Sequence, residues 1–396
     1  MLNATCSVTE LAVRIAAAIC SRTPVAQRFF DSHAEDIARA ARAVAERLSA
    51  GGSIYAFGRG AYATDAAHVA VEFVHPVLVG KPALPASDVS LSFETSLPVI
   101  VGARDVVVGF GPPQGDPDVD RALAGARAAG AYTIALGGAD GDFSVRAASD
   151  DEHVHQEIVE ITGHMLYESV HVFLEHRHRE SDAGASAFLY PFLGGEQPSR
   201  EDLIASVVAS IAQKAADAQV LRERVASEEA AVIANAVAAI VEELRAGGRL
   251  LLFGNGGSAT DATDWALDCV SPPAGLAAVP ALSLAAEPAT ITAIANDVGR
   301  EFIFLRQLIA HVRERDVVIA LSTSGGSLNV IAALEEARKR GNLTIALLGY
   351  DGGEIFRRRL ADHAIVVRSD YIPRVQEAQA TIYHSMRRAI GWLADA

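Results

Sequence analysis

Short apolar runs alternate with amphipathic segments along the whole chain. The apolar runs, most of them rich in Val, Ile and Leu, occupy residues 53–57, 105–110, 132–136, 249–253, 316–321 and 343–347. Between them, apolar residues recur at the spacing of helices that cover a core on one side. Buried strands that alternate with helices are typical of parallel sheets covered on both faces. The pattern therefore predicts an α/β fold with doubly wound parallel sheets, in which ligands bind at the carboxyl ends of the strands.

The second three strands repeat the first three. The segment LSAGGSIYAFGRGAYATDAAH, from Leu48, matches LRAGGRLLLFGNGGSATDATD, from Leu244, at an offset of 196 residues. RDVVVGF and RDVVIAL then match at an offset of 211, and QEIVEITGH and QEAQATIYH match at an offset of 220. The matches are collinear, and homologous domains tolerate such drift in loop length. The chain is therefore a tandem duplication of one α/β module.

The length of the chain fits two domains of ordinary size. Its 396 residues are too many for one ordinary core. A segment with several Gly and Pro residues separates the two copies. We expect a first domain over residues 1–180, a linker over 181–200 and a second domain over 201–396.

Composition and charge exclude several classes of function. The net charge of −15 would repel a nucleic-acid backbone, and no basic block offsets it. The three cysteines share no close spacing, which argues against a disulfide framework or a cysteine zinc cluster. No apolar run has the length of a membrane span, and the N-terminal region lacks the features of a signal peptide. We expect a cytoplasmic protein that binds a small molecule.

Two loops of the second copy have the composition of an anion-binding site. Residues 254–258 read GNGGS and residues 322–327 read STSGGS, and each loop follows a strand and enters a helix. Glycines let the backbone approach a ligand closely, and the free N–H groups at a helix start favour an anion. A serine-rich turn that only caps its helix is the alternative. Because both loops follow strand ends, we favour a phosphate-binding site.

The corresponding loops of the first copy differ. Residues 58–62 read GRGAY, and residues 109–115 read GFGPPQG. The second of these loops has no hydroxyl, and its two prolines donate no N–H. We therefore expect that the first copy has lost the phosphate site.

The first copy instead contains polar side chains of the types that bind metals. His68 and Glu72 are four residues apart on one helix, and Gln156 and His164 are eight apart on another, so each pair shares a helix face. Such a set suits a divalent metal such as zinc, or acid–base catalysis. An ordinary core or surface pair is the alternative that the spacing leaves open.

At the corresponding positions the second copy has a different set of side chains. Two aspartates replace the histidine and the glutamate, so the set is Asp264, Asp268, Gln376 and His384. These residues suit a harder cation than zinc, or Asp268 as a base on a shorter side chain, or a site that is no longer active. The spacing alone does not choose among the three.

Four motifs in order resemble a known family. They are FGNGGSATDA (253–262), AIAND (293–297), LSTSGGSLNV (321–330) and RVQEAQATIYH (374–384). Together they are similar to the sugar isomerase (SIS) domain of phosphoheptose isomerases and cover most of the second copy. The first copy resembles the family more faintly, through FGRGAYATDAAHVAVEF (57–73) and QEIVEITGH (156–164).

The resemblance implies an activity and a set of site residues. Members of the family convert sedoheptulose 7-phosphate into an aldoheptose 7-phosphate through an enediol, without a redox or nucleotide cofactor. The implied zinc site lies on His68, Glu72, Gln156 and His164, with Glu72 as base and His164 as acid. The expected substrate contacts are Asn255, Gly256, Gly257, Ser258, Asn296, Asp297, Ser322, Thr323, Ser324, Ser327 and Gln376.

Three interpretations of the duplication remain open. In the first, the copies cooperate in one isomerase, and a homodimer of the chain forms a pseudo-tetramer of SIS domains. In the second, the second copy alone is the isomerase, with Asp268 as base and His384 as acid. In the third, the protein is a non-catalytic sugar-phosphate-binding or protein-binding regulator, a role that the SIS fold also serves.

Overall fold

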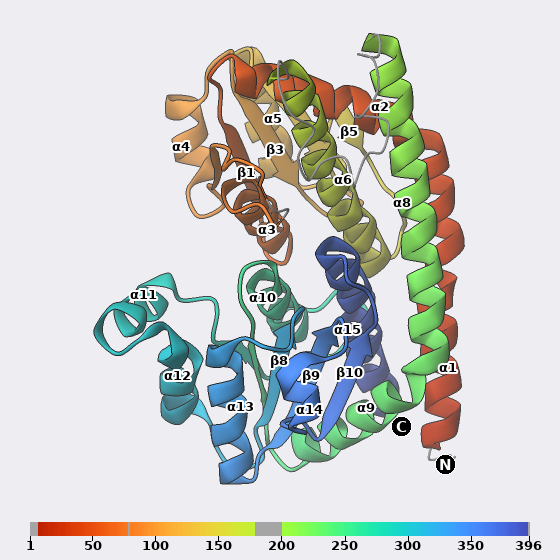
Figure 1. Cartoon of the computed structure of the whole chain (residues 1–396), viewed down its shortest axis with the longest axis vertical. Helices are drawn as coiled ribbons and strands as arrows, with labels where there is room; N and C mark the ends of the chain where they lie inside the picture. Colours follow the sequence, from red (N-terminus) through yellow and green to blue (C-terminus); the bar gives the residue numbers. More distant parts are fainter. Residues whose placement is uncertain (1–6, 78–79, 179–199, 395–396) are drawn as a thin grey trace. The chain divides into compact units, whose positions relative to one another are not determined.

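The computed structural model describes residues 7–77, 80–178 and 200–394 (Figure 1). The chain forms two compact units, which we describe one at a time. The first unit comprises Pro24–Asp217, and the second unit comprises Met1–Thr23 together with Ala218–Ala396. The expected linker over 181–200 lies outside the described residues except for its last position. None of the described helices is long and apolar enough to cross a membrane.

The first unit is built on a five-stranded parallel sheet with the order β2-β1-β3-β4-β5. Its strands are β1 (Ile54–Gly58), β2 (Ala86–Asp88), β3 (Val106–Phe110), β4 (Tyr132–Leu136) and β5 (Phe143–Val145). Its helices are α2 (Thr23–Ser49), α3 (Tyr62–Val74), α4 (Phe93–Ile100), α5 (Pro117–Ala128), α6 (Glu152–His178) and the first part of α8 (Arg200–Glu228).

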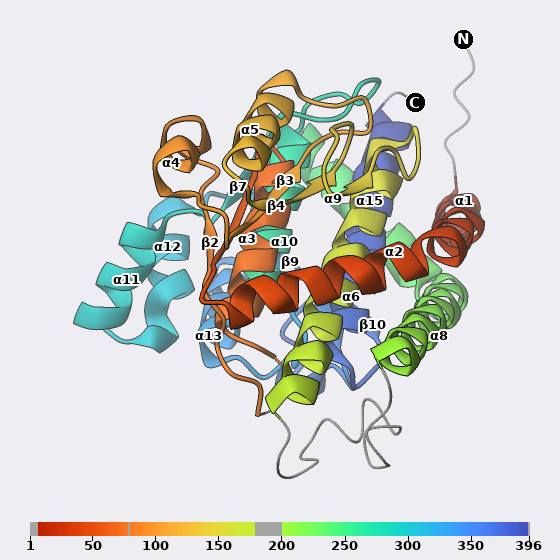
Figure 2. The same ribbon diagram turned by 90° about the horizontal axis from the view of Figure 1, so that it is seen from above.

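Helices cover both faces of this sheet because its strands are apolar on both sides. Val106 and Val108 of β3 point into the core that α2, α3 and α6 share. Val107, between them, points into the opposite core with α4 and α5. Figure 2 shows α2 and the pair α4 and α5 on opposite sides of the strands.

The second unit repeats this topology, with the strand order β7-β6-β8-β9-β10. Its strands are β6 (Leu250–Phe253), β7 (Ala281–Ser283), β8 (Val317–Ser322), β9 (Leu343–Gly349) and β10 (His363–Val367). Its helices are α1 (Val8–Ser21), the last part of α8, α9 (Ala230–Arg245), α10 (Gly257–Val270), α11 (Pro288–Asp297), η2 (Arg300–Phe302), α12 (Ile303–His311), α13 (Leu328–Arg340), α14 (Gly353–Arg357) and α15 (Ile372–Ala394). The predicted fold class, two doubly wound parallel-sheet domains in tandem, is confirmed.

The units do not follow the expected domain boundaries at their N-terminal helices. Helix α1 belongs to the second unit, where Leu11, Ile15 and Ile19 are buried in a core shared with α9 and α15. Residues 201–217 of α8 belong to the first unit, where Val207 and Ile211 are buried against its core. The observed units therefore differ from the expected domains 1–180 and 201–396 at both of these segments.

These two segments are equivalent in the repeat. The offset of 196 residues that aligns the two copies also places Leu11 on Val207 and Ile15 on Ile211. The same apolar stripe is buried in both cases, but each segment packs in the unit that is built mainly from the other copy. The two copies have thus exchanged their first helix.

Candidate functional site

The metal-type residues of the first unit lie on two helices that pack together. Helix α3 carries His68 and Glu72, and α6 carries Gln156 and His164; α3 and α6 are in contact. All four side chains are at most 5% exposed. Because α3 starts at the Gly58 turn and packs on α6, the four predicted side chains are buried on two neighbouring helices of one unit.

Glu72 and His164 are in direct contact in this set. Glu72 Oε1 lies 3.2 Å from His164 Nε2, and the rings of His68 and His164 meet edge to face with centroids 5.3 Å apart. Neither oxygen of Glu72 makes a hydrogen bond within the described part of the chain, so the 3.2 Å contact does not have hydrogen-bond geometry. Two ligands about 2.0–2.1 Å from a tetrahedral zinc ion stand about 3.3 Å apart. The pair therefore has the spacing of two ligands of one divalent metal, or of a carboxylate base beside one metal ligand.

Gln156 is oriented by a residue that the sequence did not single out. Its Nε2 donates a 3.0 Å hydrogen bond to Oδ2 of Asp65, a buried residue one turn before His68 on α3. Since Nε2 faces Asp65, the amide orientation of Gln156 is fixed. The equivalent aspartate of the second unit is Asp261, which is also buried. The repeated TDA sequence was the available signal for both.

A further carboxylate lies beside the two histidines. Glu160, one turn after Gln156 on α6, has a ligand oxygen that lies within 4.8 Å of ligand nitrogens of His68 and His164. Sequence reasoning did not identify Glu160. This residue lies four positions after Gln156 and four positions before His164. That spacing on one helix face was the available signal.

The second unit holds its own group of two carboxylates and one imidazole. His384 Nε2 lies 3.4 Å from Asp264 Oδ2 and 3.5 Å from Asp268 Oδ2, and all three residues are at most 2% exposed. The Tyr383 hydroxyl donates a 2.7 Å hydrogen bond to the same oxygen of Asp264. Gln376 is buried on α15 together with His384. The structure therefore brings the two aspartates and the histidine of the second set together, and a tyrosine binds one of the aspartates.

The phosphate-type loops of the second unit are formed as predicted at the strand ends. The loop after β8 leads into α13, which begins at Leu328, and Ser327 precedes it without a side-chain capping bond. Ser322 Oγ accepts a hydrogen bond from the Gly325 N–H, and Ser324 Oγ accepts one from the Gly326 N–H. Each of these oxygens is the acceptor in its bond, so the hydroxyl can still donate its own hydrogen to a ligand. Such hydroxyls, with the amides of a helix start, suit a phosphate.

Glycine is required at two points of this site. Gly256 precedes α10 with φ of 57°, a conformation that favours glycine. Gly325 has φ of 60°, and a Cβ there would lie 2.1 Å from the Gly352 carbonyl oxygen. Gly257 then begins α10, so its N–H is among the unsatisfied ones of the helix start. Ser258, by contrast, is buried.

A pair of asparagines joins the two loops. Asn255 Nδ2 donates to Asn329 Oδ1 at 3.0 Å, and Asn329 Nδ2 donates back to Asn255 Oδ1 at 2.8 Å. The pair links the end of β6 to the beginning of α13. Asn329 was not among the predicted residues, although it lies within the LSTSGGSLNV motif.

Asn296 and Asp297 lie on a different part of the second unit. They end α11, which packs on α12 and η2 at the outer edge of the unit (Figure 1). Asn296 Nδ2 donates a 2.7 Å hydrogen bond to Asp297 Oδ1, and both side chains are exposed. In this structure the two residues pair with each other on the surface.

In the first unit, a side chain of the protein occupies the helix start that follows β3. Asp116 precedes α5, and its Oδ1 accepts hydrogen bonds from the N–H groups of Asp118 and Val119. Arg59, from the first glycine turn, forms an ion pair with Asp118 and lies 3.9 Å from Asp116. The first unit thus satisfies this helix start with its own carboxylate.

His155 holds the same loop from the other side. Its Nδ1 accepts from the Ala148 N–H at 3.2 Å, and its Nε2 lies 3.2 Å from the Gly111 carbonyl oxygen. Burial lowers the pKa of His155 to about 4, so the imidazole is neutral and donates through Nε2. The second unit has Val375 at this position.

Comparison with known proteins identifies the family of the chain. The family model described as "SIS domain" matches residues 21–95 and 215–349, more than half of the chain. The phosphoheptose isomerase of Geobacter sp. (strain M21) is 45% identical over 153 residues, which are 38% of this chain and 79% of that protein. The phosphoheptose isomerase of Geobacter sulfurreducens is 44% identical over 174 residues, covering 44% of this chain and 90% of its own.

A solved structure shares the tandem fold along the full length. The tagatose-6-phosphate ketose/aldose isomerase from Escherichia coli matches 100% of this chain and 94% of its own, with a TM-score of 0.53 and 13% identity. At 13% identity this comparison shows a shared fold and nothing more. The chain therefore belongs to the SIS domain family, as a relative of phosphoheptose isomerases, with two SIS-type units in tandem.

Proposed function

We propose that the protein is an aldose–ketose isomerase that converts sedoheptulose 7-phosphate into a D-heptose 7-phosphate. The observation that carries the proposal is the buried contact of 3.2 Å between Glu72 and His164. A carboxylate and an imidazole in contact are the groups needed to move a proton between adjacent carbons through an enediol. The relatives named phosphoheptose isomerase support this choice of substrate.

The chain's own residues have distinct roles in this reaction. Glu72 accepts the proton from carbon, and His164 serves the oxygens of the open-chain sugar. His68, Gln156 and His164 hold a divalent metal, for which zinc is our candidate. When bound, such an ion polarises the sugar carbonyl. The reaction is redox-neutral, so it requires no nucleotide cofactor.

The phosphate group is bound by the second unit. The hydroxyls of Ser322, Thr323, Ser324 and Ser327 and the amides at the starts of α10 and α13 provide the donors. Phosphate binding far from the reacting carbons fixes the position of the chain and lowers the entropic part of the barrier. We propose that turnover requires both residue sets, and that the chain works as a homodimer.

Two substitutions in the full-length chain test the proposal. Conversion of sedoheptulose 7-phosphate is followed by NMR in Glu72→Gln and Ser324→Ala. Loss of the base should lower kcat by about 10² to 10⁴. Loss of one hydroxyl contact to a charged group should raise KM by about 10-fold or more. Glu94→Gln and Ser227→Ala, which change exposed residues in the same way, are the controls. A wild-type kcat in Glu72→Gln, or a wild-type KM in Ser324→Ala, would overturn the proposal.

One observation favours a second candidate, in which the second unit alone is the isomerase. His384 of α15 lies 3.5 Å from Asp268, so this unit holds a carboxylate–imidazole pair. Asp268 is on α10, the helix that begins at the phosphate loop. Asp268 lies about 16 Å along α10 from Gly257. In that case Asp268→Asn abolishes turnover and Glu72→Gln does not. A wild-type protein that binds sugar phosphates but converts no heptose, pentose or hexose phosphate is instead a regulator.

A further inference from the structure

Glu160 stands in the metal-type site of the first unit, outside the four residues of the family pattern. Its carboxylate oxygen and ligand nitrogens of His68 and His164 all lie within 4.8 Å of one another. Oε1 of Glu160 is shielded from solvent, and the two histidines are 5% and 1% exposed. Three ligand atoms of nitrogen and oxygen type at this spacing can bind a single divalent ion.

The helix geometry explains why Glu160 reaches this position. Gln156, Glu160 and His164 follow one another at intervals of four residues on α6, so they line one face of the helix. That face packs on α3, which carries His68 and Glu72. Residue 160 is therefore directed at the same point as its neighbours one turn before and one turn after.

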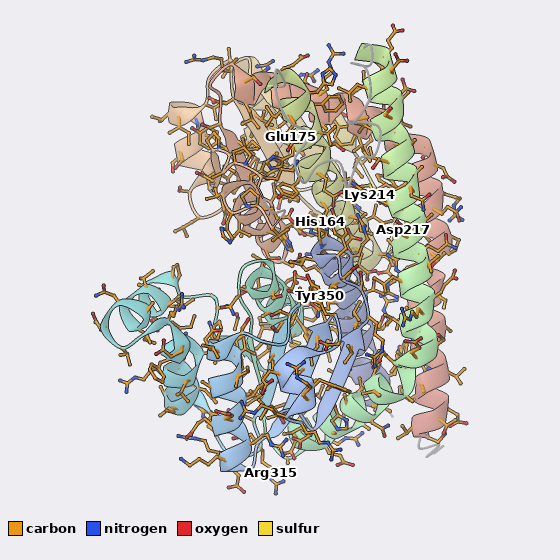
Figure 3. All side chains as sticks on the ribbon, viewed as in Figure 1. His164, Glu175, Lys214, Asp217, Arg315 and Tyr350 are labelled. Atoms are coloured by element: carbon orange, nitrogen blue, oxygen red, sulfur yellow. The ribbon has the colours of Figure 1, made fainter. Side chains whose placement is uncertain are left out.

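The charge of the set also favours a cation. Glu72 and Glu160 bring two carboxylates close to two imidazoles in a site shielded from solvent. Figure 3 labels His164 and Glu175 on α6, the helix that also carries Glu160. Buried carboxylates are costly unless a positive charge balances them. A single divalent ion would balance Glu72 and Glu160.

Glu160 is specific to the first unit. The offset of 220 residues that aligns Gln156 with Gln376 places Ala380 at this position in the second unit. Ala380 is fully buried and offers no ligand. The second unit instead has Asp264 where the first has His68. The second carboxylate of the set therefore comes from α10 in the second unit and from α6 in the first.

We propose that Glu160 is a ligand of the divalent metal in the first unit, together with His68 and His164. If Glu160 supplies the carboxylate ligand, Glu72 does not have to bind the metal. Its carboxylate is then available to accept the carbon-bound proton of the substrate. The inference rests on the metal site of the proposed function and assigns its carboxylate ligand.

Metal affinity of the full-length protein tests the assignment directly. The apoprotein is prepared with a chelator, and Zn²⁺ binding is measured by competition with a chromophoric chelator and by metal content per chain. Glu160→Gln keeps the size of the side chain and removes its charge, so Zn²⁺ should bind at least about 100-fold more weakly, beyond the 10- to 100-fold effect of outer-shell changes. Glu152→Gln, the same change on the same helix, should bind like the wild type.

A second readout covers the case in which Glu160→Gln does not fold. Glu160→Asp keeps the charge but retracts the oxygen, so it should bind Co²⁺ more weakly and shift the visible absorption bands of the bound ion. Wild-type affinity in Glu160→Gln, or wild-type affinity and Co²⁺ spectrum in Glu160→Asp, would overturn the assignment. If the wild type binds neither ion, the metal site of the proposed function is wrong. If it binds both and the Glu160 variants match it, only this inference falls.

Discussion

Arg59, in the first glycine turn of the first unit, forms an ion pair with Asp118 at the beginning of α5. Beside this pair, the Asp116 carboxylate accepts the N–H groups of that helix start. In the second unit, the corresponding helix α13 has no side-chain capping bond from Ser327. In the first unit, the N–H groups of this helix start therefore bind a carboxylate of the protein. In the second unit, the N–H groups of the equivalent helix start are donors for an external anion.

Asp116→Ala should affect stability and leave ligand binding unchanged. Loss of a capping carboxylate costs about 1 kcal/mol, which should lower the Tm of the first unit by about 2–4 °C. Calorimetry measures the transition, and isothermal titration measures sugar-phosphate binding. Asp31→Ala, at an exposed position of α2, is the control. Weaker sugar-phosphate binding in Asp116→Ala would contradict the conclusion that this helix start has no ligand role.

Asn329→Ala should weaken sugar-phosphate binding although Asn329 is not a predicted contact. The substitution removes both amide hydrogen bonds to Asn255 and releases the loop 254–258 from α13. Each neutral hydrogen bond contributes about 1 kcal/mol, so we expect a loss of affinity of about 5- to 30-fold, measured by isothermal titration. Asn235→Ala, whose exposed side chain donates to the Ala231 carbonyl one helical turn before it, is the control. Unchanged affinity in Asn329→Ala would show that the loop is held by its backbone alone.

His171 should make the first unit sensitive to acid. Burial and, second, the neighbouring Lys81 ammonium lower the pKa of His171 to about 4, while Glu175 and Glu72 act in the opposite direction. An unfolded histidine titrates near pH 6.5, so between pH 6.5 and 4 the unfolded state binds more protons. Stability should therefore be fully present above pH 6.5 and fall as the pH is lowered toward 4.

A phenylalanine substitution isolates this effect. His171 packs against the rings of Tyr167 and Phe73, so His171→Phe keeps an aromatic ring there. Its Tm should fall less steeply than that of the wild type as the pH is lowered. His75→Phe, at an exposed position, should keep the wild-type slope. Identical slopes in His171→Phe and the wild type would show that another group causes the acid sensitivity.

Cys269 should be unreactive in the folded protein. Its side chain is fully buried on α10, and burial raises the pKa of the thiol to about 12, so little thiolate forms at pH 8. Cys20 is exposed. Iodoacetamide should therefore modify Cys20 and spare Cys269, as read by mass spectrometry of peptides. Denatured protein, in which both react, is the control; rapid labelling of Cys269 under native conditions would indicate that α10 opens.

The central strands of both sheets were predictable because each is a short and mostly apolar run. All six predicted strands are present, and their ends agree within two residues. The edge strands β2, β5 and β7 are three residues long and lie at the sheet margins, where no apolar run marks them. The exchange of the first helices was not predictable, because the stripe of Leu11 and Ile15 fits the core of either copy equally well.

Motifs predicted the candidate site residues, but sequence reasoning missed the residues that contact them. His68, Glu72 and His164 meet because repeat spacing and the family pattern both fix their helix faces. Asp65, Glu160 and Asn329 were missed because their roles depend on contacts between residues far apart in the chain. Asn296 and Asp297 stand on the surface because α11 has no buried residue to draw it inward.

The exchange of α1 and the first part of α8 bears on how such a gene can evolve. A mutation that divided the gene between its two copies would give two separate proteins. Leu11, Ile15 and Ile19 would be on one of them, and the core that buries these residues would be on the other. Each product would expose an apolar groove and an apolar helix, and the fragments would have to find each other again before either was complete. Fusion of the copies is thus a step that selection does not readily reverse, and each copy is free to lose functions that the other retains.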